Sequence, residues 1–597
     1  MCGFIGEISF NKIAKENIDT ANRQIECRGP DEKNIYENIL DLNKNKINLF
    51  LIFNRLSIVE LTKYGSQPMY DEILNTLIMF NGEIFNHQEL KREILNSNKG
   101  ITFKSANSDT ELLLIGLSLY GDSFVHKLIG QFSFIFIDFN SLNLIMCRDR
   151  LGQKPLYFNL ESDSLKFSSN LKALKDISQN ADLDLSRISD YLSLNIFPGS
   201  KTMYKKILKV NPGQLIKVDL NTLEISNDYI YWNPDNYIDE KVFNYDEFLH
   251  KLNNSIEIRS KADVPVASFL SGGVDSTSIV KNLYDSDLEV NTFSVIYNDK
   301  KFDESEWIQK VVSKYRTNHI SINLEKPSYN NVIQALDSLD EPYADPSVVP
   351  SYLLCKEISN HYKVAISGDG GDELFGGYLR TEKVLNRNNF YVNKLDRLYK
   401  IYPNILGTGA NFYRYSQNPA QAYGSYLQDL KFLKLLDINK NLVYEDSFIN
   451  NSYSSSRKSL IASDYQFYLP ELMMLKVDRT SMKNSLEVRS PFVDHRLVEY
   501  MLSTNLESDS RLTHKKLLKD YLSNDFGSDF VNRRKMGFVF NVKNFIFENR
   551  NEIYDHIELL PFVEKKHLKK LFLFKNRTNS NRLWNLFTLS RNLFGGK

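Results

Sequence analysis

The chain has 597 residues, too many for one hydrophobic core, so two to four domains are expected. Its 74 lysines and arginines balance its 74 aspartates and glutamates, which excludes a basic surface that recruits nucleic acid or an anionic membrane. The apolar runs fall short of the roughly 18 residues of a membrane span, and the N-terminus lacks a secretory signal pattern. Four cysteines without a CxxC pair predict neither a disulfide framework nor a zinc site. We expect a reduced, cytoplasmic protein with no nucleic-acid or membrane partner.

Short apolar or alternating runs make the N-terminal third of the chain rich in predicted strands. They lie at residues 3–10, 47–53, 76–84, 130–139, 142–149, 155–160 and 164–169. One helical pattern begins near Asn86, and another spans Asp109 to Tyr120. This order predicts an α+β domain with hairpins and not a βαβ series. Residues 211–243, with Pro, Gly, Asn and Asp among aromatic side chains, are expected to form edge hairpins and a linker.

The pattern changes after this linker, where predicted strands alternate with helices. Apolar strands are expected at 264–270, 289–297 and 363–367, and two of them run into glycine-rich turns. Such alternation predicts a parallel sheet whose ligands lie at the carboxyl ends of the strands. From about Arg380 onward the pattern is mostly helical.

Cys2 is a candidate nucleophile because Met1 is commonly removed before a small side chain. The freed α-amine of Cys2, with an ordinary pKa of about 7.7–8.0, can act as the base for its own thiol. A lone cysteine near a terminus more often has no such role. The interpretation therefore depends on the segments that follow.

Four short segments supply groups that a thiol attacking an amino-acid amide needs. They are RGPD (28–31), NRLSIV (54–59), FNGEIFN (80–86) and SDTE (108–111). Arg55 can hold an α-carboxylate, and Glu83 and Asp109 can hold an α-ammonium. The Asn81 side chain and the Gly82 N–H can form an oxyanion hole. Taken singly, Arg55 could be a surface charge, Asn81-Gly82 a hairpin turn and Asp109 a helix N-cap.

These segments resemble the N-terminal-nucleophile glutaminase domain of class B glutamine-dependent asparagine synthetases. RDRLGQKPLYF (148–158) and LKFSSNLKAL (165–174) continue the resemblance. It implies that Leu56, Ser57, Ile58 and Val59 also line the glutamine pocket. The sequence departs from the family at Asn170, where the family usually has Glu, and this puts communication between the domains in doubt.

The second half begins with SGGVDS (271–276), between a predicted strand and a helix. Glycines such as Gly272 and Gly273 let the backbone wrap an anion, and Ser271, Ser276 and the helix N-terminus can donate to it. A Gly-Gly turn alone would be weak evidence, because such turns occur in any fold. The segment lacks the P-loop lysine and resembles the pyrophosphate loop of ATP pyrophosphatases, which form acyl-adenylates.

A second turn, SGDGGDELFGGY (367–378), adds acidic residues. Asp275 and Asp372 are the expected ligands of Mg²⁺ bound to the phosphates. Without the first turn, Asp369 and Asp372 would be interpreted as a solvated acidic helix start. The resemblance implies that four residues border the adenylate, namely Leu270, Val295, Ser367 and Gly368.

The resemblance also implies catalytic roles for Asp369, which supports formation of the intermediate, and for Lys535 in RRKMGF (533–538), which stabilises negative charge. A single lysine near a C-terminus is otherwise a surface residue. Residues 472–500 also match the family. Much of the stretch from DRTSM (478–482) to LEVRSPF (486–492) is expected to be helix packing, with Met473, Met474 and Met482 filling the core. Residues 381–453 are the least diagnostic part of the chain.

Together these features predict a glutaminase domain (2–215, αββα sandwich), a linker and edge hairpin (216–243) and an ATP-pyrophosphatase domain with a helical C-terminal part (244–597). The expected reaction amidates an ATP-activated carboxylate, with L-aspartate as the first choice and glutamine, ATP and Mg²⁺ as the other small molecules. A uronic acid or a peptide carboxylate is the alternative acceptor. A non-catalytic sensor of glutamine or nucleotide is a further alternative, but it would have no reason to keep the residues of both predicted sites. The sequence does not decide whether the protein forms a homodimer.

Overall fold

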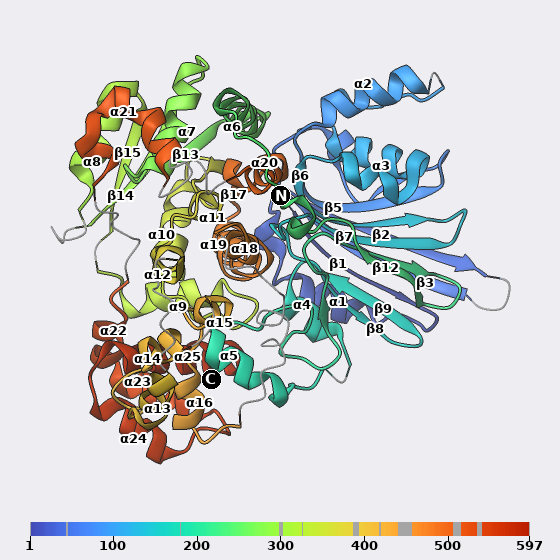
Figure 1. The fold of residues 1–597 in the computed structure, drawn as a ribbon. Coiled ribbons are helices and arrows are strands. Elements are labelled where there is room, and N and C mark those ends of the chain that lie inside the picture. The colour runs from blue at the N-terminus through green and yellow to red at the C-terminus, as the bar shows by residue number, and fades with distance from the viewer. Residues whose placement is uncertain are drawn as a thin grey trace.

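The computed structural model describes residues 2–42, 46–98, 100–179, 181–297, 303–324, 326–385, 393–416, 419–439, 457–505, 515–533 and 540–595. Figure 1 shows a sheet-rich part formed by the first third of the chain, beside a part in which helices surround a smaller sheet. No helix among these residues combines the length and the apolar character that a membrane crossing requires.

The N-terminal part contains two six-stranded sheets. The first has the order β10-β8-β9-β1-β3-β2, with β1 (Cys2–Ser9), β2 (Glu32–Asp41), β3 (Lys46–Arg55), β8 (Tyr157–Leu160), β9 (Ser164–Ser168) and β10 (Leu208–Lys209). The second has the order β12-β11-β7-β6-β5-β4, with β4 (Met69–Asp71), β5 (Thr76–Ile84), β6 (Gly130–Asp138), β7 (Asn143–Arg148), β11 (Gln214–Asp219) and β12 (Glu224–Ile230). Neighbouring strands are antiparallel, as in β1 against β3 and β5 against β6.

Helices cover the outer face of each sheet, which gives four layers (Figure 1). Buried apolar residues such as Phe4, Phe53 and Ile135 fill the space between the sheets. Helices α1 (Lys15–Asn22) and α4 (Leu171–Ile177) pack on the first sheet, and α2 (His87–Ser97) and α3 (Asp109–Tyr120) pack on the second. The αββα sandwich predicted from the sequence is therefore confirmed.

Strand β2 was not predicted from its sequence, EKNIYENILD. It is an edge strand whose residues alternate between half-buried and exposed, and even Ile35 and Ile39 lie on the exposed face. Because neither face is fully buried, the strand needs few apolar residues, and the period-two signal is weak. Residues 211–243 do contain the expected edge hairpin, formed by β11 and β12.

The second part is built on a five-stranded parallel sheet in the order β15-β14-β13-β16-β17. Its strands are β13 (Val266–Phe269), β14 (Asn291–Tyr297), β15 (Asn318–Leu324), β16 (Val364–Ile366) and β17 (Glu487–Arg489). Helices α6 (Tyr245–Ser260), α7 (Val274–Asp285) and α8 (Ser305–Tyr315) pack on one face, and α10 (Val348–Ile358) and α19 (Leu475–Met482) pack on the other. The parallel sheet predicted from the alternating pattern is confirmed.

Strand β17 is a part of the segment 478–492 that is not helix, although helix packing was expected for much of that segment. Met474 and Met482 are buried core residues, as expected, but the chain leaves α19 and adds Glu487–Arg489 to the sheet edge. A three-residue strand is too short to show a period in the sequence.

Further helices cover the sheet and extend the C-terminal part. They are α5 (Ile188–Leu194), α9 (Tyr329–Asp337), α11 (Gly371–Leu374), α12 (Leu379–Leu385), α13 (Asn393–Ile401), α14 (Ala410–Ser416), α15 (Pro419–Gly424), α16 (Leu430–Leu435), α18 (Arg457–Ser463), α20 (His495–Ser503), α21 (Lys516–Val531), α22 (Val542–Glu548), α23 (Arg550–Glu558), α24 (Lys565–Leu573) and α25 (Arg577–Phe594). Apolar residues of α25 join those of α1, α4 and α5 in one core cluster, so the C-terminal helices help to hold the two parts together.

Buried ion pairs cross the interface between the two parts. Arg28, in the RGPD segment, donates to both carboxylate oxygens of Asp478 on α19, at 2.9 and 3.0 Å. The Nε of Arg28 also donates to the carbonyl of Cys2 at 3.2 Å. Burial alone would raise the pKa of the Asp478 carboxyl, but Arg28, Arg479 and Lys154 together hold that pKa well below its usual range. The candidate nucleophile is thus tied to a helix of the other part.

Two further basic residues, Arg479 and Lys209, extend this network of ion pairs. Arg479 donates to Asp340 at 2.7 Å and to the Tyr157 hydroxyl at 2.5 Å. Lys209 donates to Glu341 and Glu471, each at 3.2 Å. Each of these buried acids has a basic partner, either in the same part of the protein or in the other part. The interface therefore contains charged groups that are paired.

We predict that Arg28→Met destabilises the docked structure, because it leaves a buried carboxylate without its bidentate partner. Loss of one member of a buried pair costs about 3–5 kcal/mol. Lys33→Met is the control, because Lys33 pairs with Asp19 at the surface and such pairs contribute little. Scanning calorimetry should show a lower unfolding temperature for Arg28→Met alone. Equal shifts in the two variants would contradict the prediction.

Candidate functional site

Most of the predicted glutamine-binding residues line one pocket. Its walls include Cys2, Arg55, Leu56, Ile58, Val59, Gly82, Glu83 and Asp109, together with Gln67, Thr110 and Glu487. The cavity volume is about 30 Å³, room for roughly two waters, so side chains must move before a larger ligand can enter. Ser57 is not part of the lining, since its N–H donates to Asp31 at 2.7 Å on the exposed side.

Asn81 is oriented by Cys2. The Oδ1 of Asn81 accepts a hydrogen bond from the Cys2 backbone nitrogen at 3.0 Å, which leaves the Nδ2 donor for another group. Within the described part of the chain, that buried Nδ2 has no partner. A donor held beside the thiol with no other acceptor can stabilise an oxyanion.

Gly82 follows Asn81 within strand β5, so these two residues are not a hairpin turn. The φ of Gly82 is 150°, and an added Cβ would lie 2.0 Å from the carbonyl oxygen of Gln131. Only glycine fits this close approach of two strands.

Burial raises the pKa of the Cys2 thiol, although a backbone hydrogen bond from Leu56 and the nearby Arg55 oppose the rise. The resting group is therefore a thiol that needs a base, which agrees with attack assisted by the α-amine of the same residue.

Arg55 is a buried residue and not a surface charge. Its guanidinium donates to the Thr62 carbonyl at 3.0 Å and to the Glu60 carbonyl, and it pairs with Glu32 at 3.3 Å. A Cβ on Gly65 would lie 2.1 Å from the guanidinium, so glycine at position 65 makes room for it.

Glu83 and Asp109 bring two buried carboxyl groups to the pocket. Burial is the main cause that raises the pKa of each carboxyl. Glu83 forms an ion pair with Arg489 of β17, and Asp109 accepts from the Ile84 N–H at 3.1 Å. Asp109 does not cap α3, since the Ser108 side chain does so. Buried acids with raised pKa values favour a cationic ligand such as an α-ammonium.

A second and larger cavity, of about 290 Å³, is lined by most of the predicted ATP residues, although Gly272 and Gly273 are not among them. It lies at the carboxyl ends of the parallel strands, as expected for this fold. The predicted residues in its lining are Leu270, Ser271, Asp275, Ser276, Val295, Ser367, Gly368, Asp369 and Asp372. Apolar side chains such as Phe293, Leu354 and Val488 line part of the same cavity and can contact a nucleotide base.

The first glycine turn joins β13 to α7. Gly272 has a φ of 68°, a left-handed conformation that lets the chain reverse into the helix. The N–H of Gly273 donates to the Ser271 hydroxyl at 3.3 Å, and the Ser271 and Ser276 hydroxyls lie 3.2 Å apart. Hydroxyls and the start of α7 thus face one space where an anion can bind.

The two predicted metal ligands share one ammonium group. The Nζ of Lys515 lies 2.5 Å from Asp275 and 2.6 Å from Asp372. An added Cβ on Gly377 would lie 2.3 Å from Asp372 and 2.5 Å from the Lys515 side chain, so glycine at 377 leaves space for this contact. A position where two carboxylates already hold a cationic group has hard oxygen donors and the charge that Mg²⁺ requires.

Lys515 was missed in the sequence, where it stands in the unremarkable segment RLTHKKLLK. Its φ of 60° is left-handed, a conformation that costs energy in a residue with a side chain. Lys515 is recognised by its burial, its backbone conformation and its contacts with two acids of the cavity lining. None of these properties is visible in the sequence.

Lys535 lies outside the described residues, so its catalytic role stays a prediction. Arg533, two positions earlier, donates to Glu304 at 2.7 Å and to the carbonyl of Ser271 at 3.5 Å, and both acceptors line the larger cavity.

Asn170 caps helix α4, since its Oδ1 accepts from the Ala173 N–H at 2.9 Å. The contact with the second part is made by the next residue, because the Leu171 N–H donates to Asp340 at 2.9 Å. The effect of Asn170 on communication between the domains stays a prediction.

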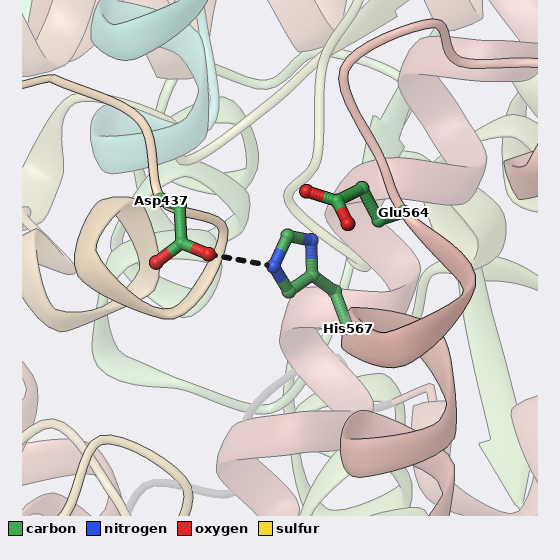
Figure 2. A group of neighbouring side chains, drawn as sticks. All are labelled: Asp437, Glu564 and His567. Carbon is green, nitrogen blue, oxygen red and sulfur yellow. Dashed lines mark hydrogen bonds and ion pairs between the residues drawn. The ribbon is translucent and has the colours of Figure 1, made fainter.

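Asp437, Glu564 and His567 form another polar cluster, at the start of α24 (Figure 2). His567 contacts Asp437 at 3.1 Å, and the Lys566 ammonium lies 3.3 Å from Asp437 and 3.1 Å from Glu564. Lys566 thus already compensates both carboxylates, and none of these residues lines either cavity described above.

Comparisons with known proteins agree with the two cavities. A family described as asparagine synthase matches residues 247–593, and a glutamine amidotransferase domain matches residues 1–232. Asparagine synthetase (glutamine-hydrolyzing) 1 of Bacillus subtilis (strain 168) is 28% identical, over 98% of this chain and 95% of that protein. Asparagine synthetase (glutamine-hydrolyzing) 3 of the same organism is 28% identical, over 90% of this chain and 86% of that protein.

We predict that Lys515→Met tightens binding of a divalent cation in the absence of nucleotide, because it removes the competing ammonium from between Asp275 and Asp372. With Mn²⁺ as a paramagnetic probe, the Kd should fall about tenfold, or by about 1.4 kcal/mol. The gain should disappear in the double variant Lys515→Met, Asp275→Asn. An unchanged Kd in the single variant would show that the two acids do not form the cation site.

Proposed function

The chain belongs to the asparagine synthase family, and from this premise we propose that it converts L-aspartate, glutamine and ATP into asparagine, glutamate, AMP and diphosphate. As a member of this family with an amidotransferase domain, it is a carbon–nitrogen ligase that takes its nitrogen from glutamine. What we propose beyond membership of the family is that aspartate is the acceptor and that the individual residues have the roles described below.

The main support for this function is the presence of two cavities with different chemistry. Residues scattered over the chain converge on two cavities, one with a buried thiol among charged groups and one with two carboxylates beside glycine turns. The apolar residues Leu56 and Ile58 of the first cavity pack against Val364 of β16 and Met482 of α19. An apolar contact of this kind suits transfer of neutral ammonia, because ammonium is not a nucleophile.

In the first cavity, Arg55 holds the α-carboxylate of glutamine, and Glu83 and Asp109 hold its α-ammonium. The Cys2 sulfur attacks the side-chain amide carbon while the α-amine of Cys2 takes the thiol proton. Asn81 and Gly82 stabilise the oxyanion. The amine then passes the proton to the leaving nitrogen, which departs as ammonia. Water hydrolyses the thioester, which releases glutamate and restores the thiol.

In the second cavity, a carboxylate oxygen of the acceptor attacks the α-phosphorus of ATP, and diphosphate leaves. Ser271, Ser276 and the start of α7 bind the phosphates, and Lys535 stabilises the charge that develops. Asp275 and Asp372 would hold Mg²⁺, which supplies charge compensation for the phosphates. Ammonia then attacks the acyl carbon, and AMP leaves with the acceptor's former oxygen.

Lys476 favours a dicarboxylic acceptor such as aspartate over a uronic acid. It carries the one cationic side chain among the described residues that line the cavity, and it is 8% exposed. Its ammonium donates to the Ser347 hydroxyl at 3.3 Å, and no carboxylate among the described residues lies within ion-pair distance. A buried ammonium without an acidic partner favours an anionic ligand, which the second carboxylate of aspartate supplies.

The predicted products distinguish adenylation from phosphoryl transfer. With glutamine, ATP-Mg and an ¹⁸O-labelled aspartate side-chain carboxylate, mass spectrometry should find asparagine and AMP carrying one labelled oxygen. A parallel panel should include uronic acids. Stoichiometric ADP and phosphate would contradict the mechanism, and amidation of a uronic acid in place of aspartate would contradict the acceptor.

We predict that Lys476→Met raises the KM for aspartate about tenfold or more, through loss of a charge-assisted contact, and leaves glutamine hydrolysis unchanged. Lys483→Met is the control, because Lys483 directly follows the same helix but is exposed. Steady-state kinetics with ammonia as the nitrogen source isolates the acceptor site. An unchanged KM for aspartate would rule out this role for Lys476.

A further inference from the structure

The pocket around Cys2 contains one residue from the synthetase part of the chain. Glu487, on β17, is 1% exposed and lines the same cavity as Cys2, Arg55 and Asp109. Its negative charge also contributes to the raised pKa values of Cys2, Glu83 and Asp109, although burial is the main cause for each. The glutaminase domain therefore does not form its pocket alone.

Arg489 holds Glu487 in this position. It is fully buried, its Nε donates to Glu487 at 2.7 Å, and it also forms an ion pair with Glu83. Two carbonyl oxygens, those of Arg259 and Lys261, accept from its Nη1 at 2.8 and 2.7 Å. One guanidinium thus fixes a carboxylate from each domain side by side.

The charges around the pocket favour a cationic ligand. Three carboxyl groups, those of Glu83, Asp109 and Glu487, line it, while the Arg489 guanidinium contacts two of them. The Arg55 guanidinium lies in the same lining, so a ligand ammonium that enters among the three carboxyl groups offsets their charge while Arg55 remains for a ligand carboxylate, in a buried, weakly screened space.

The same strand reaches the ATP cavity. The carbonyl of Arg489 accepts from the Ser367 N–H at 2.9 Å, and the hydroxyls of Ser367 and Ser490 lie 2.9 Å apart. Ser367 lines the larger cavity. Any shift of β17 therefore affects both sites.

We propose that Glu487 is a third carboxylate of the glutamine pocket, which binds the α-ammonium together with Glu83 and Asp109, and that Arg489 positions it there. Glutamine then binds tightly only when the synthetase domain is docked. This inference rests on the function proposed for the Cys2 pocket.

The test is the glutaminase kinetics of Glu487→Gln in the full-length chain. The KM for glutamine should rise about tenfold with little change in kcat, because a contact to the bound ammonium is weakened while the thiol chemistry is intact. Glu487→Asp should recover part of the loss. Arg489→Lys should raise the KM similarly, because a lysine cannot reach two carboxylates and two carbonyls together.

Glu471→Gln is the matched control. Glu471 is also a buried carboxylate of the synthetase part, and it pairs with Lys209 across the interface but does not line the pocket. Its KM for glutamine should stay within about twofold of wild type, because the residue lies outside the pocket and Lys209 keeps Glu341 as its partner. Asparagine synthesis from ammonia, measured in every variant, shows that the protein is folded and the second site works.

The outcomes separate this inference from the proposed function. If the wild type does not hydrolyse glutamine, the proposed function fails. If the wild type is active but Glu487→Gln keeps its KM, or loses kcat at unchanged KM, Glu487 does not bind the ammonium and the inference is wrong. An equal rise in KM for Glu471→Gln would mean that the rise in Glu487→Gln comes from weaker docking of the two domains. That result would also overturn the inference.

Discussion

The buried ion pairs between the two domains are the interaction on which both sites depend. Arg28 contacts the carbonyl of Cys2 and both oxygens of Asp478, so a single side chain links the candidate nucleophile to helix α19. The same helix carries Lys476, which lines the ATP cavity. Such pairs are costly to desolvate and contribute less net stability than apolar contacts, but they permit only one relative position of the two surfaces. The apolar cluster that α25 shares with α1, α4 and α5 adds contacts between the two parts that involve no charge.

Both cavities use internal counter-ions to keep buried charges compensated. Lys515 lies between Asp275 and Asp372, and Arg489 lies between Glu83 and Glu487. In the proposed function, a ligand of the same sign as the internal cation shares the carboxylates in each case: a metal ion at Asp275 and Asp372, and an ammonium at Glu83 and Glu487. Because an unpaired buried charge is expensive, these internal pairs keep the ligand-free fold stable while leaving the acids available for exchange.

The helices and strands that were predicted correctly are those whose own residues show a clear apolar pattern along their length. Helix α3 begins and ends where its apolar run does, and β5 and β6 are buried on both faces. Strand β2 was missed because half of its residues face solvent, and β17 because three residues show no period. Their positions depend on the neighbours with which they pair, and the local sequence does not record those neighbours.

The sequence by itself identified residues that gather at the two cavities wherever they lie in short, contiguous segments: Cys2 after Met1, Asn81-Gly82, and the two glycine turns with Asp275 and Asp372. A turn between a strand and a helix brings its own residues together, so such motifs predict their geometry directly. Only the tertiary structure decided that Lys515, Glu487 and Arg489 complete these sites. They lie far along the chain, in segments with no motif, and reach the cavities because α21 and β17 pack beside them. Their roles come from burial and charge pairing, which only the packed fold creates.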